Sequence, residues 1–191
     1  MDAREALFHR RSIRKYKSDP ISREDLVDIL EAGICAPSAI NLQHWYFVAV
    51  TSPEEREKMM GIMGKVFGKF QPVLQERFAK NPEVIEETKQ FLTGFGNAPV
   101  CVLAFLLKDD YPDRDGAIQS VSAAIENILL AATAKGIGSC WLTAPQRMGF
   151  GPLLRETFAP DKGEFVAAIT LGYSADESKM PPRRDGRYVI V

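Results

Sequence analysis

The sequence contains few residues that could build a metal centre or a disulfide framework. Among 191 residues there are only two histidines, His9 and His44, and three cysteines, Cys35, Cys101 and Cys140. Neither histidine lies near a cysteine or at a helical His-x-x-x-His spacing, so we expect no zinc site. The cysteines are odd in number and widely spaced, which predicts reduced thiols in the core. No segment resembles a nucleophile elbow, so nothing favours a Ser-His-Asp hydrolase.

The sequence also lacks an excess of one charge and a long apolar run. The 24 Lys and Arg residues nearly balance the 25 Asp and Glu residues, which leaves a formal net charge of -1. So small a charge gives no general attraction to nucleic acid or to an anionic membrane. No apolar stretch approaches the roughly 18 residues that span a bilayer, and the opening Met-Asp-Ala-Arg-Glu lacks the order of a secretory signal. We therefore expect a cytoplasmic protein without nucleic-acid or membrane partners.

The composition is typical of one globular domain. Hydrophobic residues make up 46% of the chain and charged residues 26%. No internal repeat, low-complexity tract or interdomain linker interrupts the sequence, and its length lies within the usual range for one core. We predict a single domain over residues 1–191.

Hydrophobic periodicity predicts helices and strands that alternate unevenly. Helices are expected over residues 3–10, from 22 to before 37, from 52, from 81 to about 94–96, over 115–134 and over 151–158. Strands are expected at 45–51, 99–107, 137–142 and 165–173, with a further β-prone segment at 188–191. The 115–134 helix is the longest and most apolar, so it is expected to be central, and Gly136 is placed to end it in the left-handed conformation. This order predicts an α+β layered domain with a mixed sheet.

Two short polar segments could carry chemistry. The first is Arg10-Arg11-Ser12-Ile13-Arg14, whose guanidinium groups and hydroxyl are suited to a phosphate ester, although alone it could be a solvated basic turn. The second is the loop 35–45, where Ser38, Asn41 and Gln43 can donate to and accept from a heteroaromatic ring beside Trp45. By itself this loop could equally be an ordinary turn with an aromatic anchor.

Taken together and in order, these segments resemble the opening signatures of the nitroreductase family of flavoproteins. Arg-Arg-Ser-x-Arg is followed by Ala-Pro-Ser-x-x-Asn-x-Gln-x-Trp, ending at Trp45. The segment 136–143, Gly-Ile-Gly-Ser-Cys-Trp-Leu-Thr, is similar to a third family signature, and Pro181-Pro182-Arg183-Arg184 resembles a fourth. The resemblance implies a nitroreductase-like fold of three layers, with a mainly antiparallel mixed sheet flanked by helices and a dimer with a C-terminal extension.

The resemblance further implies a tightly bound FMN at the interface of a homodimer. The residues implied to hold the phosphate and ribityl oxygens are Arg10, Arg11, Ser12 and Arg14, with Arg183 or Arg184 reaching the phosphate from the C-terminal end. The residues implied to lie against the flavin ring from the partner subunit are Pro37, Ser38, Ala39, Asn41 and Gln43. The backbone groups implied to face the reactive edge of the ring are those of Leu142, Thr143 and Ala144.

Two features depart from the family pattern or leave it incomplete. His44 stands where the family usually has proline, and it could face the substrate or cap the strand, of which we favour the structural role. The polar ligands that longer relatives place on a mid-chain helix have few counterparts, because residues 91–97 offer only Thr93 and Asn97. The pyrimidine edge of the flavin is therefore left unassigned.

The implied function is an FMN-dependent oxidoreductase that takes electrons from NADH or NADPH and passes them, in a ping-pong sequence, to a nitroaromatic or quinone-like acceptor. The flavin would do the chemistry, so we nominate no catalytic side chain. The helical stretch 54–97 is expected to form a lid over the pocket, and its candidate lining residues, most of them better suited to a plain core, are Met59, Met63, Phe67, Phe70 and Phe91. The apolar end 188–191 is expected to pair with the sheet of the partner.

Other functions remain open at this point. The same fold could support reductive dehalogenation, oxidation of a peptide-derived ring or fragmentation of the flavin itself. A flavin-binding protein with a sensing or storage role is a second alternative. A basic nucleic-acid module is a distant third, because the arginines are few and the net charge is slightly negative.

Overall fold

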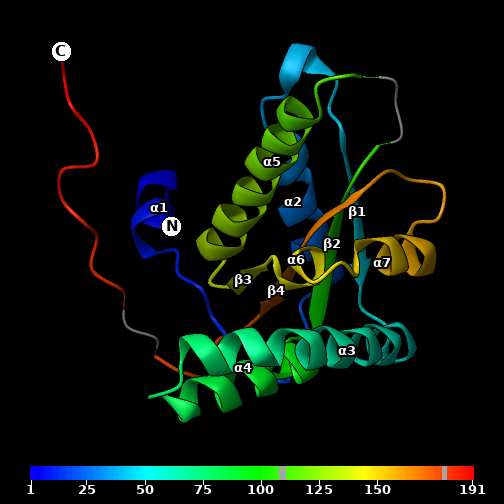
Figure 1. Ribbon diagram of the computed structural model, residues 1–191. Coiled ribbons are helices and arrows are strands. Elements are labelled where there is room, and N and C mark those ends of the chain that lie inside the picture. Colours follow the sequence, from blue (N-terminus) through cyan, green and yellow to red (C-terminus); the bar gives the residue numbers. More distant parts are fainter. Residues whose placement is uncertain (108–110, 178–179) are drawn as a thin grey trace.

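The fold is built on one antiparallel sheet. In the computed structural model, which describes residues 1–107, 111–177 and 180–191, the four strands have the order β1-β2-β4-β3 (Figure 1). They are β1 (Trp45–Val50), β2 (Val100–Leu106), β3 (Gly138–Leu142) and β4 (Phe165–Gly172). All three strand pairs are antiparallel, and a parallel arrangement occurs among the described residues only at the isolated bridge between Ser12 and Ser139.

Helices cover both faces of this sheet and give three layers. They are α1 (Ala3–His9), α2 (Arg23–Ile34), α3 (Pro53–Arg77), α4 (Pro82–Gly94), α5 (Arg114–Ala134), α6 (Ala144–Arg147) and α7 (Gly151–Phe158), with 3-10 turns η1 (Ala39–Asn41) and η2 (Phe95–Asn97). One core joins the sheet to α2 and α5, and the other joins it to α3, α4 and α7. The predicted layered α+β fold is therefore confirmed.

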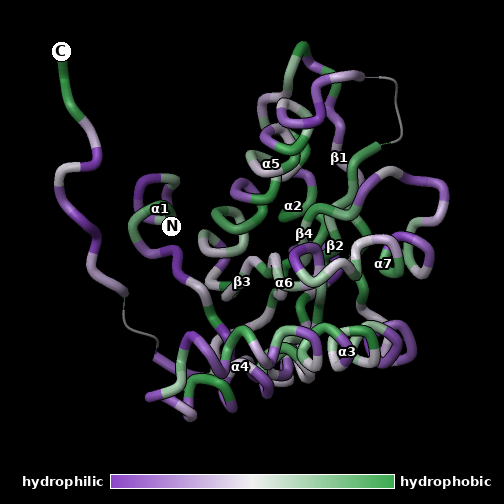
Figure 2. The backbone as a smooth tube through the Cα atoms, viewed as in Figure 1, coloured by the Kyte–Doolittle hydropathy of each residue, from purple (hydrophilic) through white to green (hydrophobic). Residues whose placement is uncertain are grey.

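The two cores follow the alternation of side chains along β2. Val100, Val102 and Ala104 pack toward α5, whereas Cys101, Leu103 and Phe105 pack toward α3 and α4. Successive side chains of a strand point to opposite faces of a sheet, so a strand covered on both faces is apolar throughout. This explains the uninterrupted apolar sequence of β2, which Figure 2 shows at the centre of the molecule.

Helix α5 is the central helix, as its sequence predicts. It is long and apolar enough to cross a membrane by length and composition, but it packs against α2 and all four strands. A Cβ atom added at Gly33 would lie 2.7 Å from Cγ1 of Ile128, so the missing side chain lets α2 approach α5 closely. These contacts identify α5 as a core helix of a globular domain. Gly136 follows it with φ +73, in the predicted left-handed region.

Helix starts match the sequence signals at two of three places. The Ser22 and Ser52 side chains accept hydrogen bonds from the amides of Asp25 and Glu55 and so cap α2 and α3. Asn81 precedes α4 as predicted, but its side chain makes no capping bond to the backbone and donates to Glu83 at 3.1 Å instead. The short helix α6 was not predicted.

One further prediction was wrong. Cys35 is exposed, whereas Cys101 and Cys140 lie in the core as expected. The reason is that Cys35 follows the last turn of α2 and belongs to neither apolar face. The β-prone end 188–191 forms no strand within the described single chain, and Ile190 is 89% exposed. Its expected pairing with the sheet of a partner stays a prediction. Figures 1 and 2 show the C-terminal segment standing apart from the sheet, on the far side of α1.

Candidate active site

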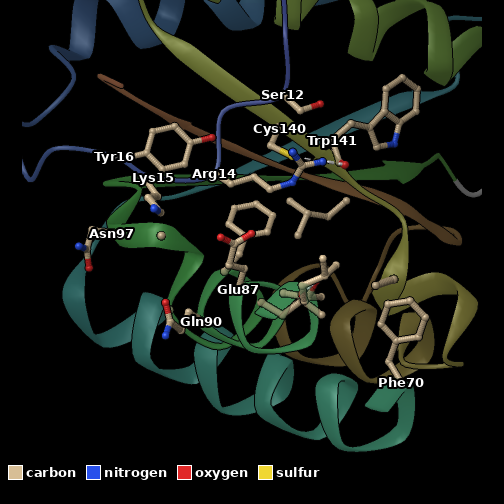
Figure 3. Close-up of a pocket in the computed structure, with 18 of the residues that line it drawn as sticks. Ser12, Arg14, Lys15, Tyr16, Phe70, Glu87, Gln90, Asn97, Cys140 and Trp141 are labelled. Carbon is tan, nitrogen blue, oxygen red and sulfur yellow. Dashed lines mark hydrogen bonds between the residues drawn. The ribbon is translucent and has the colours of Figure 1, made fainter. Parts of the chain in front are cut away.

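A large cavity lies between the β3 edge of the sheet and the α3–α4 layer (Figure 3). Its volume is about 980 Å3, and it is lined by five segments that are distant in the sequence. Residues that line it include Ser12, Arg14, Lys15 and Tyr16 from the N-terminal segment, Phe70 and Leu74 from α3, Glu87, Gln90 and Phe91 from α4, Asn97 from η2, Cys140 through Ala144 and Arg147 from β3, α6 and the residue between them, and Ala175 and Asp176. Five of the predicted flavin ligands are among them, namely Ser12, Arg14, Leu142, Thr143 and Ala144.

The N-terminal basic segment is an extended strand-like stretch held at the edge of the sheet. The amide of Ile13 donates to the carbonyl of Ser139 at 2.9 Å, and the amide of Tyr16 donates to the carbonyl of Gly96 at 2.7 Å. The apolar side chains of Ile13 and Tyr16 are buried. The residues between them, including Arg14, consequently line the cavity.

The side chain of Tyr16 anchors this segment to strand β4. Its hydroxyl donates to the carbonyl of Ile13 at 2.6 Å and lies 2.8 Å from Oγ1 of Thr170 in β4. Burial is the main cause that raises the pKa of the Tyr16 phenol above its ordinary value, so the group stays neutral. The resulting turn holds the backbone on both sides of Arg14.

Two glycines are needed for this close approach. Gly96 has φ +57, and a Cβ atom there would overlap the carbonyl oxygen of Arg14. A Cβ atom on Gly138 would lie 2.8 Å from Cγ1 of Ile13. Because both positions tolerate only hydrogen, the path of the basic segment depends on glycine in η2 and in β3.

The turn after β3 forms the opposite wall of the site. Leu142, Thr143 and Ala144 line the cavity and lead directly into α6. Beyond them, Nε2 of Gln146 donates to Glu164 at 2.6 Å, and the same carboxylate accepts two bonds from Arg114 at 2.7 and 2.9 Å. The turn is therefore anchored to both β4 and the start of α5. The first amides of a helix have no intrahelical acceptor, so this backbone can donate to a bound group.

The other predicted phosphate ligands do not line the cavity within this chain. Nε of Arg10 pairs with Glu126 of α5 at 3.3 Å, and Arg11 donates to the carbonyl of His9 at 3.3 Å. Nε of Arg11 is buried without a hydrogen-bond partner among the described residues. Arg183 and Arg184 lie in the exposed tail, away from the cavity (Figure 1).

The loop 37–43 lies at the far end of the molecule from the cavity. Figure 1 shows η1 beside the beginning of α5, and the amide of Ala39 donates to Oγ of Ser120 at 3.0 Å. None of Pro37, Ser38, Ala39, Asn41 and Gln43 lines the cavity of its own chain.

This loop is also conformationally strained. Ile40 has φ 43, and it is 77% exposed. Positive φ is rare for a β-branched residue, and such strain is concentrated at functional sites. Asn41 and Gln43 likewise have positive φ, at 58 and 50. The loop is thus built in a fixed, unusual shape that its own chain does not use for the cavity.

Sequence reasoning missed several cavity residues. Glu87 and Gln90 lie on one face of α4, three residues apart, and Figure 3 shows Glu87 pointing toward Arg14. A polar pair at this spacing on an otherwise amphipathic helix was the available signal. Phe70 and Phe91 line the cavity as expected, and Asn97, the polar residue noted in the sequence, does so too. Met59, Met63 and Phe67 are plain core residues.

His44 occupies a structural position. It is 1% exposed, its ring stacks on Tyr111 with centroids 4.9 Å apart, and its carbonyl accepts from the amide of Leu107 at 2.7 Å. It does not line the cavity. The favoured alternative, a structural role at the start of β1, is the one that these contacts support.

The cavity offers no activated thiol. Cys140 lines it, but burial is the main cause that raises the pKa of this thiol, and burial also raises the pKa of Cys101 to about 12. A protonated thiol is a poor nucleophile. Within the described ranges, no group of three or more His, Cys, Asp or Glu residues is placed to hold a metal ion.

Comparison with known proteins places the chain in a family. The model of the nitroreductase family matches residues 7–173, and the chain belongs to this family. It is similar to a protein of Archaeoglobus fulgidus provisionally named NADH dehydrogenase/NAD(P)H nitroreductase, with 36% identity over 90% of this chain and 84% of that protein. It is also similar to the 5,6-dimethylbenzimidazole synthase of Rhodospirillum rubrum, with 28% identity over 94% of this chain and 86% of the synthase.

A solved structure agrees with the fold. The crystal structure of a nitroreductase with bound FMN from Bacteroides fragilis is 27% identical in sequence, with a TM-score of 0.76. The similarity covers 100% of this chain and 99% of that chain. The nitroreductase-like fold that the sequence motifs implied is thus confirmed.

Proposed function

We propose that this chain is an FMN-dependent oxidoreductase that carries electrons from NADH or NADPH to a small electrophilic acceptor, such as a nitroaromatic or a quinone, in a ping-pong sequence. The observation that carries the proposal is the meeting of Ser12 and Arg14 with the 142–144 turn around one cavity, in a chain of the nitroreductase family. The family relatives named as NAD(P)H nitroreductases and the FMN-bound structure support the same conclusion.

The residues present fit FMN. The cavity of about 980 Å3 is large enough for a flavin ring and a second flat molecule, because ligand sites usually measure about 300 to 1,000 Å3. Arg14 supplies cationic donors, Ser12 a hydroxyl, and Phe91 an apolar surface. A phosphate monoester carries about −1.5 to −2 charges at neutral pH, which suits the cationic Arg14 and the hydroxyl of Ser12 at the cavity. Bound FMN would supply hydride acceptance from the nicotinamide and electron donation to the acceptor.

The chain's own residues would bind and orient. Arg14 would neutralise negative charge at one side of the site, and the backbone of Thr143 and Ala144 would donate along the reactive edge. Tyr16 and Cys140, both neutral, would keep the floor of the site uncharged. Glu87 and Gln90, which line the cavity, would contact the pyrimidine edge that sequence reasoning left unassigned. No side-chain acid or base is needed, in line with the chemistry of the cofactor.

A homodimer would complete the site. The 37–43 loop and Arg183 and Arg184 lie away from the cavity of their own chain, so they could reach only a second copy. Exposed apolar side chains occur on α1, on this loop and on the tail; Phe8 is 66%, Ile40 77% and Ile190 89% exposed. Such side chains are typical of a surface that a partner covers. A monomer with full flavin content at micromolar concentration would contradict this part of the proposal.

The remaining expectations form part of the proposal. Residues 54–97, which contain α3 and α4, would act as a lid on one side of the cavity while packing into the core of a single domain over residues 1–191. The protein would be cytoplasmic, with a small-molecule acceptor and no nucleic-acid or membrane partner. The net charge of -1 and the burial of α5 support these points.

A different flavin reaction on the same fold is the second candidate. The similarity to a 5,6-dimethylbenzimidazole synthase favours keeping it open, because that relative is not named as a nitroreductase. Fragmentation of the flavin would consume the bound cofactor, whereas a reductase would regenerate it. A stoichiometric loss of flavin during turnover would therefore favour flavin fragmentation over the proposed reductase reaction.

The deciding experiment is a visible spectrum of the protein purified without added cofactor, followed by anaerobic addition of NADH and NADPH separately. We expect a flavin band that bleaches within seconds and returns on addition of a quinone or nitroaromatic compound. A flavin band that persists would favour a storage or sensing protein. A colourless protein that also takes up no FMN would overturn the proposal.

A further inference from the structure

Two cationic residues, Arg147 and Lys69, lie where α3 meets the turn after α6. Arg147 is the last residue of α6 and lines the cavity. Nζ of Lys69 on α3 donates to the carbonyl of Met148, the next residue, at 2.8 Å. Both side chains belong to exposed residues, and in the described part of the chain neither is paired with a carboxylate. This pair is available for an anion.

The pair lies away from the segment assigned to the flavin phosphate. Figure 3 shows Phe70, which follows Lys69 in the chain, at the opposite end of the cavity from Lys15, Tyr16 and Asn97. The α3 and α6 helices contact each other at this end. An anion bound by Arg147 and Lys69 would therefore not compete with one bound at residues 10–14.

The carboxylates of the cavity are placed elsewhere. Glu87 points toward Arg14 in Figure 3, and Asp176 pairs with Lys15 at 3.4 Å. Attraction between charges falls with distance and with screening, so these carboxylates neutralise the Arg14 and Lys15 side more than the Arg147 side. Among the described residues, Arg147 therefore lines the cavity without a carboxylate paired to it.

We propose that Arg147 and Lys69 bind a phosphate group of the reduced nicotinamide dinucleotide while its nicotinamide ring occupies the cavity. The inference rests on the proposed function, because that function brings the dinucleotide to this site. A guanidinium donates two parallel bonds to a phosphate, and an ammonium adds a point charge. The phosphate has two sources, the 2′-phosphate of NADPH or the pyrophosphate that NADH and NADPH share.

The test uses the FMN-loaded protein and the variant Arg147→Gln, with Lys65→Met as the control. Lys65 is exposed on α3, four residues before Lys69, and does not line the cavity, so its loss changes the charge and leaves the pair intact. The dissociation constants of NADP+ and NAD+ are measured by calorimetry, and the KM and kcat for NADPH and NADH by anaerobic flavin bleaching. Arg147→Gln is expected to weaken dinucleotide binding about tenfold, with kcat little changed, because charge-assisted bonds to phosphate are lost.

The pattern of losses identifies the phosphate. Weaker binding of NADP+ alone assigns the 2′-phosphate, and equal weakening of NADP+ and NAD+ assigns the pyrophosphate. Lys69→Met is expected to weaken binding of the same dinucleotide, and Lys69→Arg, which keeps the positive charge, is expected to restore it. Unchanged dissociation constants in Arg147→Gln, or loss of FMN from that variant, would overturn the inference.

Failure of the inference differs visibly from failure of the proposed function. A wild-type protein that binds no FMN refutes the proposed function. In that case the dinucleotide titrations do not test the roles of Arg147 and Lys69. A wild-type protein that binds FMN and bleaches with NADPH, combined with variants of unchanged affinity, leaves the function standing and refutes only the roles of Arg147 and Lys69.

Discussion

At the scale of single residues, the site depends on two glycines, which have no side chain, as much as on the side chains that line the cavity. Gly96 and Gly138 admit the N-terminal segment to within van der Waals contact of η2 and β3. Tyr16 then holds the segment through its hydroxyl bonds to Ile13 and Thr170. The position of Arg14 is consequently determined by neighbours that carry no charge themselves.

Replacing Gly96 by alanine tests this dependence. We expect a loss of about 1 to 3 kcal/mol in the free energy of unfolding, together with weaker FMN binding, because the new Cβ atom overlaps the Arg14 carbonyl and φ is positive. Urea unfolding and FMN titration measure the two effects. Gly64→Ala, on an exposed part of α3 where a Cβ atom meets nothing within 4 Å, is the matched control and is expected to be neutral or stabilising. Equal stability of the two variants would contradict the account.

The buried phenol of Tyr16 predicts a pH dependence. The pKa of Tyr16 in the folded protein is raised above its ordinary value of 10.0, so the protonated phenol favours folding. Its contribution is complete below pH 10 and is lost as pH rises above 10, because only the unfolded chain then ionises this group. Stability curves between pH 8 and 11 should show a smaller alkaline loss in Tyr16→Phe than in the wild type. Superimposable slopes for the two proteins would be inconsistent with this assignment.

At the scale of elements, helix α3 has a well-capped N-terminus but contains a proline in its interior. Ser52 caps the helix and Pro53 occupies its first turn, yet Pro72 lies inside it and has no amide to donate to the preceding turn. A helix of 25 residues tolerates this because its buried residues, including Met59 and Phe67, pack into the core. The α3–α4 layer therefore owes its shape to packing more than to local helix preference.

Pro72→Ala should raise the free energy of unfolding, by up to about 3 kcal/mol, because the alanine amide can complete the helical bond that proline forgoes. Thermal unfolding measures the change. Pro82→Ala provides the comparison, since Pro82 stands at the start of α4, where its missing amide would have no helical partner, and little change is expected. A stability gain at Pro82 matching that at Pro72 would argue against the stated cause.

At the scale of the whole molecule, one chain holds only part of the proposed binding residues. The cavity has Ser12, Arg14 and the 142–144 turn, whereas the 37–43 loop lies at the other end and the tail runs outside. Apolar residues 188–191 in water cost free energy that a partner surface would recover. The complete site is accordingly a property of the assembly that we propose.

Removal of residues 187–191 tests that assembly. We expect the truncated protein to shift from dimer toward monomer in analytical ultracentrifugation and to bind FMN more weakly, because the apolar end loses its place on the partner. The double variant Arg183→Ala and Arg184→Ala is expected to keep the dimer while weakening FMN, since it removes charge and leaves the apolar end. Truncated protein that stays dimeric with full FMN affinity would refute the role of the tail.

The fold was predictable wherever its cause is local. The capping of α2 by Ser22, the apolar spacing of α5 and the alternation of β2 depend on residues close together in the chain. The pairing of the tail with a partner's sheet stays a prediction, because a strand needs a partner and β propensity by itself supplies none. Among the residues predicted from contiguous motifs, Ser12, Arg14 and residues 142–144 line the cavity, and their role as flavin ligands stays a prediction.

The sequence by itself therefore determined the helices and strands, the family, and the segments 10–14 and 142–144 of the candidate site. Each of these depends on residues that are close together in the chain. Only the tertiary structure decided that Glu87, Gln90 and Arg147 face the same cavity as Arg14, since that depends on how α4 and α6 are rotated against the sheet. It also separated the 37–43 loop from the cavity of its own chain. Spacing along the sequence carries no information on such distances, because packing of helices on a sheet sets them.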